Sequence, residues 1–541
     1  MCRSRIVAGL FGLTLAASCW SQDQAVTTLA LPDGEELIAW ISTSSFRFCR
    51  SWGEEKCAAR PPAGSSGIEV TRADGASSIR LNTEYVTVEI DRKDGRLRVS
   101  DSRGKELMAE TGPAKGGGGA VAIERAVTAG EAFYGLGARR DERADARGQI
   151  VRTSRPFLIS SQGYGLDHRS AGDYVFDLAS TSAERYQIRL EGSQKFEYYF
   201  YYGPDPKSIL EEHRLAVLSR GVRDFGVLKP DSLPRFATLL PAPQEGSWES
   251  LADSIRMLVH ASLSGTVNPV FDLAAYRGAP DALFRRAVQL ASVMPLVCDS
   301  DAAPLTEERR KVQDDMLRWR RRLVSFLQTY VEETNSRGYP MIHPLPMQYP
   351  NDVKGREIAD QFLLGDEILV APIHTETGRR PVYFPMGNWT DIRTNRLYPG
   401  RQTVEIESPA SELPLFVRNG SIIPLASDEP GGPMALHYLP KLAAEFFLYE
   451  PDTYDYSQMH ASPALDLMRL EIESRKARTY EWVVHHLPAV RQVRTGETLF
   501  SKAPDRRSLQ PGTWYYDREQ ENLHVMVEVP AGATRITHIE F

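Results

Sequence analysis

The chain has 541 residues, of which 42% are hydrophobic and 25% charged, as in soluble globular proteins, and this length predicts about three or four domains. The net charge of −7 shows no basic surplus, so no nucleic-acid partner is expected. One tight group of basic residues, Arg318 and Arg320 to Arg322, falls on a predicted helix and is interpreted as a solvated helix face.

Residues 1–22 are predicted to be a signal peptide. A basic start is followed by an apolar run over residues 6–17, which has signal-peptide length and is too short to span a bilayer as a helix. Residues 15–19 loosely resemble a bacterial lipoprotein box, which makes Cys19 a candidate lipidation site. We therefore expect an exported bacterial protein that is either periplasmic or anchored to the membrane as a lipoprotein.

Export makes disulfides possible, and two of the five cysteines lie close together around a glycine-containing loop. We therefore predict a disulfide between Cys49 and Cys57; two free thiols are the alternative. Cys298 stands alone in the sequence. No metal-ligand spacing occurs among the cysteines and the eleven histidines, so no metal or other cofactor is expected.

The N-terminal part, residues 27–234, is predicted to be mostly strand. Apolar and polar residues alternate with period two, and turn residues such as Asp94-Gly95 separate the segments. The glycine run at residues 116–119 precedes a strand-like sequence, so we expect a loop and no phosphate-binding turn. This pattern favours a β-sandwich. The expected strands include residues 85–91, 97–100, 186–190 and 195–202.

The hydrophobic period changes between residues 235 and 373, where helices and strands alternate. Such alternation predicts βα units with parallel strands. After residue 372 the strand pattern returns and continues to the end of the chain. The expected helices cover residues 248–264, 282–289 and 307–336, and the expected strands cover residues 267–271 and 291–297.

Several motifs together resemble glycoside hydrolase family 31, the α-glucosidase and α-xylosidase family. They read FYGLG, YYGPDP, GYPMIHPL, QFLLGDEILVAPI and LYEPDTYDY, and they begin at residues 133, 201, 338, 361 and 448. The resemblance covers most of residues 80–490 and implies a multidomain protein. It implies a galactose-mutarotase-like β-sandwich at 23–235, a (β/α) barrel at 236–376, and proximal and distal C-terminal β-sandwich domains at 377–440 and 441–541.

The barrel predicted by this resemblance is truncated. A complete (β/α)₈ barrel typically needs about 250 residues, whereas residues 235–373 supply roughly 140. Only about three or four strands of ordinary length fit in this interval. We therefore expect that the early part of the barrel is missing.

The two carboxylates of a retaining glycosidase are missing as well. Such enzymes place a nucleophile and an acid/base about 5–5.5 Å apart. The nucleophile of the family, an aspartate in a W-x-D-x-x-E type strand, has no counterpart here. The acid/base position of the family, five residues before a tryptophan, corresponds to Pro243, which cannot transfer a proton. The nearby Glu245 is interpreted as a solvated turn residue.

Part of the sugar-binding pattern remains. The D-I-G-G-F motif of the family appears as D-L-A-A-Y, so the resemblance makes Asp272 and Tyr276 candidate substrate-binding residues. The P-L-F-R-S-H motif has lost its arginine and histidine to Cys298 and Ser300. The alternative for Asp272 is a strand-end residue that caps local backbone.

The sequence therefore predicts a family 31-like exported protein of carbohydrate metabolism that is catalytically inactive. It would bind carbohydrate or act as a scaffold. The expected partner is a carbohydrate ligand, and whether the chain forms an oligomer stays open. Trp389 and Tyr454 are candidates for stacking on sugar, although a place in the core is the more ordinary role for such aromatics.

Two other hypotheses remain open. The first is an active α-glycosidase with an altered site that uses carboxylates such as Asp272, Asp299 or Asp301, which follow expected strands where barrel enzymes carry their active sites. The second is a decayed gene product that does not fold stably. Intact periodicity and well-placed capping glycines argue against decay.

Overall fold

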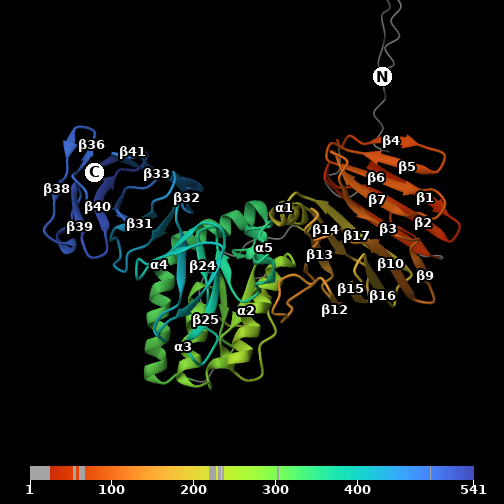
Figure 1. The fold of residues 1–541 in the computed structure, drawn as a ribbon, viewed down its shortest axis with the longest axis horizontal. Helices are drawn as coiled ribbons and strands as arrows, with labels where there is room; N and C mark the ends of the chain where they lie inside the picture. Colours follow the sequence, from red (N-terminus) through yellow and green to blue (C-terminus); the bar gives the residue numbers. More distant parts are fainter. Residues whose placement is uncertain are drawn as a thin grey trace, which may run out of the picture.

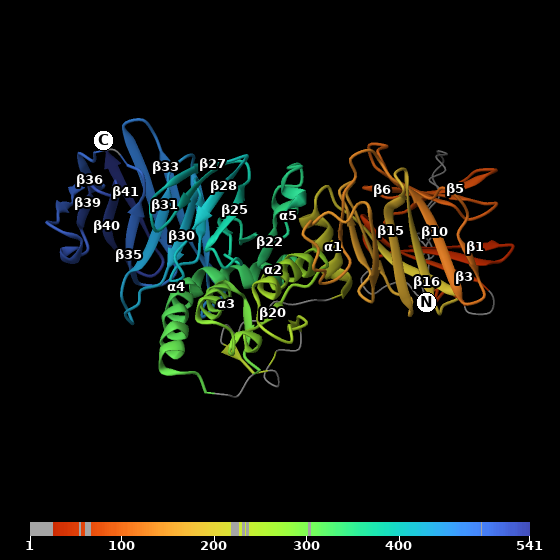
Figure 2. The same ribbon diagram turned by 60° about the horizontal axis from the view of Figure 1, so that its bottom comes forward.

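The computed structural model describes residues 25–52, 56–59, 67–217, 227–229, 233, 237–300, 304–487 and 489–541. Three blocks lie in a row: an N-terminal β block, a central block that contains the longest helices, and a C-terminal β block (Figures 1 and 2). Several β-sheets and few helices make up the protein, as expected for this multidomain class. Within the described residues, no helix is long and apolar enough to cross a membrane.

The N-terminal block consists of three antiparallel sheets around a shared apolar core. The first sheet contains, in spatial order, β1 (Val26–Leu31), β2 (Gly34–Trp40), β3 (Ser45–Trp52), β17 (Lys195–Tyr202), β14 (Tyr164–His168), β13 (Phe157–Ser160) and β11 (Phe133–Gly135). The second contains β12 (Gln149–Thr153), β15 (Asp173–Ser182), β16 (Arg185–Glu191), β10 (Ala120–Ala126) and β9 (Lys115–Gly117). The third contains β4 (Thr71–Asp74), β5 (Ser78–Asn82), β6 (Val86–Asp91), β7 (Leu97–Asp101) and β8 (Glu106–Ala109).

The glycine run at residues 116–119 differs from its expectation. Gly116 and Gly117 belong to β9 and pair with β10, and only Gly118 and Gly119 form the turn, both with positive φ. A β-carbon added at Gly116 would lie 2.1 Å from the ring of Trp52, so only glycine allows β9 to approach that ring. The loop prediction was therefore wrong for the first two glycines.

The central block contains a four-stranded parallel sheet in the order β18 (Val227–Leu228), β21 (Leu296–Cys298), β20 (Pro269–Asp272) and β19 (Thr238–Leu239). Its helices and turns are α1 (Pro206–Val217), α2 (Trp248–Leu263), η3 (Ala274–Tyr276), α3 (Asp281–Val293) and α4 (Glu307–Arg337). A capping box between Ser247 and Ser250 begins α2, and Gly338 in the left-handed conformation ends α4.

The prediction of a strand at residues 291–297 was wrong for the first half of that segment. Helix α3 continues to Val293, and β21 begins only at Leu296. Residues 291–297 are buried throughout, and a short apolar run that is buried on all sides has no periodicity to separate helix from strand.

The C-terminal block begins with a six-stranded sheet that joins it to the central block. This sheet contains β22 (Ile342–Pro344), β23 (Phe362–Leu364), β24 (Ile368–Val370), β29 (Leu415–Arg418), β26 (Asn388–Asp391) and β27 (Leu397–Pro399). The pair β25 (Arg379–Phe384) and β28 (Gln402–Glu407) lies alongside, and α5 (Leu345–Gln348) and η4 (Gly355–Glu357) follow β22.

Two further six-stranded sheets complete the C-terminal block. One contains β30 (Ser421–Leu425), β31 (Met434–Leu439), β35 (Arg478–Val484), β40 (Asn522–Val529), β39 (Thr513–Asp517) and β38 (Ser501–Lys502). The other contains β32 (Ala444–Glu450), β33 (Asp455–Pro463), β34 (Leu467–Ser474), β41 (Ala533–Glu540), β36 (Gln492–Thr495) and β37 (Thr498–Leu499), and η5 (Arg506–Ser508) follows β38. One continuous apolar core runs from α2 and α3 through α4 into these sheets.

Candidate functional site

The carboxyl ends of β20 and β21 bring the sequence-predicted carboxylates to one edge of the parallel sheet. Asp272 ends β20 and is almost fully buried. Its Oδ1 accepts a hydrogen bond from the Ala274 backbone N–H at 3.0 Å, and its Oδ2 accepts one from the Ser300 hydroxyl at 2.8 Å. Asp272 thus holds the turn into η3 and the loop after β21 in place, which is how a strand-end capping residue acts.

Asp299, one strand away, is bound by a cation of the same chain. The Nε of Arg277 donates to Oδ1 at 2.7 Å, and Nη2 of the same guanidinium donates to Oδ2. This is the two-pronged geometry in which arginine binds a carboxylate most strongly. Both oxygens of Asp299 therefore already have partners. Asp301, the third carboxylate named from the sequence, lies outside the described residues.

The thiol of Cys298 lies at the end of β21 and is buried. Burial, reinforced by the negative charges of Asp272 and Asp299, raises its pKa to about 11. The thiol is therefore protonated at neutral pH, and a protonated thiol is a poor nucleophile.

Tyr276 does not face open space. Its side chain is fully buried, its hydroxyl lies 3.1 Å from that of Ser254 in α2, and its ring stacks on Phe271 with centroids 5.8 Å apart. Burial raises the pKa of its phenol. These contacts fasten η3 to α2 and β20, so the side chain has a packing role.

Little space remains beside Asp272. The cavity there, which Pro243 and Asp272 help to line, has a volume of about 10 Å³. One water molecule needs roughly 10–15 Å³ measured in this way, and sites for small ligands usually span about 300–1,000 Å³. The pocket that Pro243 and Asp272 help to line is therefore too small for a sugar ring. Glu245 lies exposed on the neighbouring loop.

A larger hollow lies after α5. Its volume is about 460 Å³, and its lining comes from residues 348–354 together with Tyr383, Met386 and Arg401. We name it the Tyr383 hollow. The sequence analysis missed it, because the segments that line it lie far apart in the sequence. The signal that the sequence offers is a polar and aromatic run, QYPND, which is separated by two residues from the end of the GYPMIHPL motif.

The two aromatic residues proposed for stacking differ in position. Trp389 is fully buried and donates its Nε1–H to the carbonyl of Pro385 at 2.9 Å, so it is a core residue. Tyr454 is 71% exposed in the turn between β32 and β33. Among the described residues, no group of three or more histidine, cysteine, aspartate or glutamate side chains is arranged to hold a metal ion.

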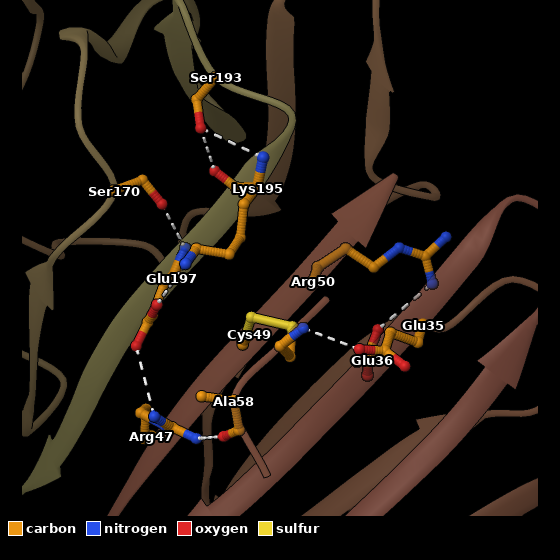
Figure 3. The surroundings of a disulfide bond; sticks show 11 residues. Glu35, Glu36, Arg47, Cys49, Arg50, Ala58, Ser170, Ser193, Lys195 and Glu197 are labelled. Atoms are coloured by element: carbon orange, nitrogen blue, oxygen red, sulfur yellow. Dashed lines mark hydrogen bonds and ion pairs between the residues drawn. A yellow bond between two sulfur atoms is a disulfide. The ribbon is translucent and has the colours of Figure 1, made fainter. Parts of the chain in front are cut away.

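A disulfide joins Cys49 in β3 to Cys57, with 5.9 Å between the Cα atoms (Figure 3). It holds the segment 56–59 against the sheet. The Cys57 N–H donates to Glu35 Oε1 at 2.7 Å, and Arg47 contacts the carbonyl of Ala58 (Figure 3). Cys19, the candidate lipidation site, lies outside the described residues.

One part of the chain matches a known protein family. Residues 338–423 match the model described as the glycosyl hydrolase family 31 C-terminal domain. This stretch includes β22 to β29 and contains most of the residues around the Tyr383 hollow.

Curated relatives match longer stretches. Alpha-glucosidase 2 of Bacillus thermoamyloliquefaciens is 26% identical over 301 residues, which is 50% of this chain and 38% of that protein. The SITS-binding protein of Tetronarce californica is 30% identical over 218 residues, which is 38% of this chain and 31% of that protein. The chain thus spans about a third of the length of the curated relatives that it matches.

Solved structures share the fold. A GH31 dextranase of Flavobacterium johnsoniae, complexed with glucose, superposes with a TM-score of 0.80 at 14% identity, covering 95% of this chain and 99% of that chain. The cycloalternan-forming enzyme of Listeria monocytogenes gives a TM-score of 0.79 at 16% identity and covers 96% of this chain and 76% of that one. The family model over residues 338–423 and the curated relatives support membership of glycoside hydrolase family 31, and the solved structures show that the chain shares the fold of family 31 enzymes.

Proposed function

We propose that this chain is an exported member of family 31 that binds carbohydrate without hydrolysing it. The observation that carries the proposal is the state of the two carboxylates at the ends of β20 and β21. Asp272 is bound to Ala274 and Ser300, and Asp299 is bound to Arg277.

Retaining hydrolysis needs one free carboxylate to attack the anomeric carbon and a second to give and take a proton. Hydrogen bonds and an ion pair stabilise the charge of a carboxylate and so weaken it as a nucleophile, and the guanidinium of Arg277 binds both oxygens of Asp299. Pro243 at the acid/base position supports the same conclusion, as does the cavity of about 10 Å³ beside Asp272.

We also propose that the central block is the remnant of a (β/α) barrel. The described strands form a four-stranded parallel sheet, and a complete barrel has eight. On this proposal the domains keep the boundaries expected from the sequence: a sandwich at 23–235, the remnant at 236–376, and C-terminal domains at 377–440 and 441–541. The signal peptide at 1–22 and lipid attachment at Cys19 complete the proposal.

The ligand class follows from the relatives. Two solved structures of the dextranase hold glucose and isomaltotriose, and the cycloalternan-forming enzyme holds a pentasaccharide substrate. One curated relative is named for binding and not for a reaction. The names of the dextranase complexes and of the cycloalternan-forming enzyme support a neutral, glucose-containing oligosaccharide as the ligand of this chain.

The alternative is an active α-glycosidase with an altered site, and the names of the relatives favour it, since several are α-glucosidases. Calorimetric titration of the purified protein with glucose, maltose and isomaltotriose separates the two. Binding that leaves the sugar intact after prolonged incubation supports our proposal. Conversion of the bound sugar supports the hydrolase, and no binding of any of the three sugars rejects the binding function.

A further inference from the structure

The Tyr383 hollow has the size and position of a ligand site. Its volume of about 460 Å³ lies within the range of about 300–1,000 Å³ that small-molecule sites occupy. It is formed by the loop after α5 and by the ends of β25 and β28, so two separate parts of the chain meet there. Ligand sites occur preferentially at such junctions.

A carboxylate in the hollow is fixed in place. The Tyr383 hydroxyl donates to Asp352, at 2.9 Å from Oδ1 and 2.7 Å from Oδ2, and the Gly355 N–H donates to Oδ1 at 3.1 Å. An ionised carboxylate has about four lone-pair positions, so Asp352 can still accept a hydrogen bond from a ligand hydroxyl. The ring of Tyr383 is buried, which holds this pair rigid.

A guanidinium stands at the same hollow with its donors largely unused. Arg401 has a φ of 60°, and its backbone N–H is held by the carbonyl of Phe384 at 2.7 Å. Within the described part of the chain its guanidinium contacts the sulfur of Met386 at 3.2 Å and forms no ion pair. An arginine carries five N–H donors in a rigid fork, so Arg401 can donate to neighbouring hydroxyls of one ligand.

Apolar atoms complete the lining. Val353 is 71% exposed and Met386 is 56% exposed, and both belong to the hollow together with Tyr349. Two exposed apolar side chains beside a fixed acceptor and a guanidinium donor match the chemistry of a pyranose, which has hydroxyls at its edge and C–H groups on its faces.

A second hollow of about 620 Å³, lined by parts of residues 426–434 and 476–479, lacks this combination. Its described lining contains no aromatic side chain. Its cations Lys476 and Arg478 are engaged by Glu450 at 3.3 and 3.0 Å. Of the two hollows, the Tyr383 hollow is therefore the better match for a sugar.

We propose that the Tyr383 hollow binds a glucose-type pyranose away from the strand ends of the barrel remnant. Asp352 accepts from one hydroxyl, Arg401 donates to others, and Val353 and Met386 lie against a C–H face of the ring. This inference rests on the proposed carbohydrate-binding function, because it assigns that function a site.

The test is calorimetric titration with isomaltotriose on the full-length mature protein and on three variants. Asp352→Asn and Arg401→Ala should each weaken binding by about tenfold or more, since the first removes the charge of the acceptor and the second removes the charged donor. Arg379→Ala is the matched control: this arginine lies on β25, the strand that carries Tyr383, is 57% exposed, and pairs with Glu407 outside the hollow. It should bind as the wild type does.

The titrations distinguish a wrong site from a wrong binding function. If the wild type binds and Arg401→Ala binds equally well, the site is wrong although the binding function stands. If the wild type binds none of the three sugars, both proposals fail. Arg401 is exposed, so this variant should keep the wild-type melting temperature and remain informative even if Asp352→Asn unfolds.

Discussion

The carboxyl ends of β20 and β21 and the Tyr383 hollow are both rich in polar side chains, but they use their hydrogen bonds differently. At the strand ends, Asp272 and Asp299 bind other groups of the same chain, and about 10 Å³ of space is left beside Asp272. In the hollow, Asp352 is also held by Tyr383 and Gly355, but Arg401 keeps unused donors beside a space of about 460 Å³. The strand ends thus use their polar side chains to hold local structure, whereas the hollow leaves a guanidinium and open space for a ligand.

The largest effect should come from Tyr276, because its ring is fully buried between α2 and β20. Tyr276→Ala should lower the free energy of unfolding by about 3–5 kcal/mol, the usual cost of removing a buried aromatic ring. Met386→Ala in the hollow, where the side chain is 56% exposed, should stay within about 0.5 kcal/mol. Urea denaturation measures both, and equal losses would remove the distinction between the two regions.

Arg277→Ala should come next. It would leave the carboxylate of Asp299 without its cation at a site where that side chain is 9% exposed. Breaking one partner of a largely buried pair costs about 3 kcal/mol. The double variant Arg277→Met with Asp299→Leu should recover part of this loss, because no unpaired charge remains. A double variant as unstable as Arg277→Ala would contradict the assignment.

Asp272→Ala should have a smaller effect, about 1–3 kcal/mol, since the Ala274 N–H and the Ser300 hydroxyl lose their acceptor. Asp272→Asn keeps an acceptor for Ala274 and should recover most of the stability. Thermal melting of the two variants compares them. If both variants melt as the wild type does, Asp272 does not cap the strand end.

The smallest expected effect is a pH dependence at Glu367, in the turn between β23 and β24. Burial, together with the charge of Asp366, raises the pKa of Glu367 to about 7 in the folded protein. The folded state therefore binds the proton more tightly than the unfolded state, so this group's contribution to stability falls as pH rises from about 4.5 to 7. Burial alone would raise the pKa of Asp366 too, but its contacts with His343 and Lys207 hold that pKa well below its ordinary value.

Melting temperatures of the wild type and of Glu367→Gln between pH 5 and pH 7.5 test this. Glutamine cannot titrate, so the variant should lose less stability than the wild type across this interval. Parallel pH profiles would show that Glu367 is not protonated in the folded state.

Much of the fold follows from local sequence. The period of two in β6 and β7, the serine cap of α2 and the glycine that ends α4 each predict an element that the structure contains. The boundary between α3 and β21 could not be predicted from the sequence, because residues 291–297 are buried throughout and show no periodicity that separates helix from strand. Gly116 was misassigned because its role depends on Trp52, which is distant in sequence.

The strand-end site and the Tyr383 hollow also differ in how far the sequence predicts them. The position of Asp272 at a strand end already indicated a capping role, since such a residue has backbone N–H groups close by in sequence. The Tyr383 hollow could not be predicted, because the register of β25 against β28 brings Tyr383 and Arg401 near one another, and the packing of the loop after α5 adds Asp352. No local pattern records those contacts.

The central claim is that the strand ends no longer catalyse, and hydrolysis of nitrophenyl α-glucoside, nitrophenyl α-xyloside, maltose and isoprimeverose tests it most directly. Purified wild type, Asp272→Asn and Pro243→Asp should all remain at background, because a restored acid at position 243 would still lack a partner nucleophile. Turnover by the wild type that disappears in Asp272→Asn would contradict the account and establish the altered-site hydrolase.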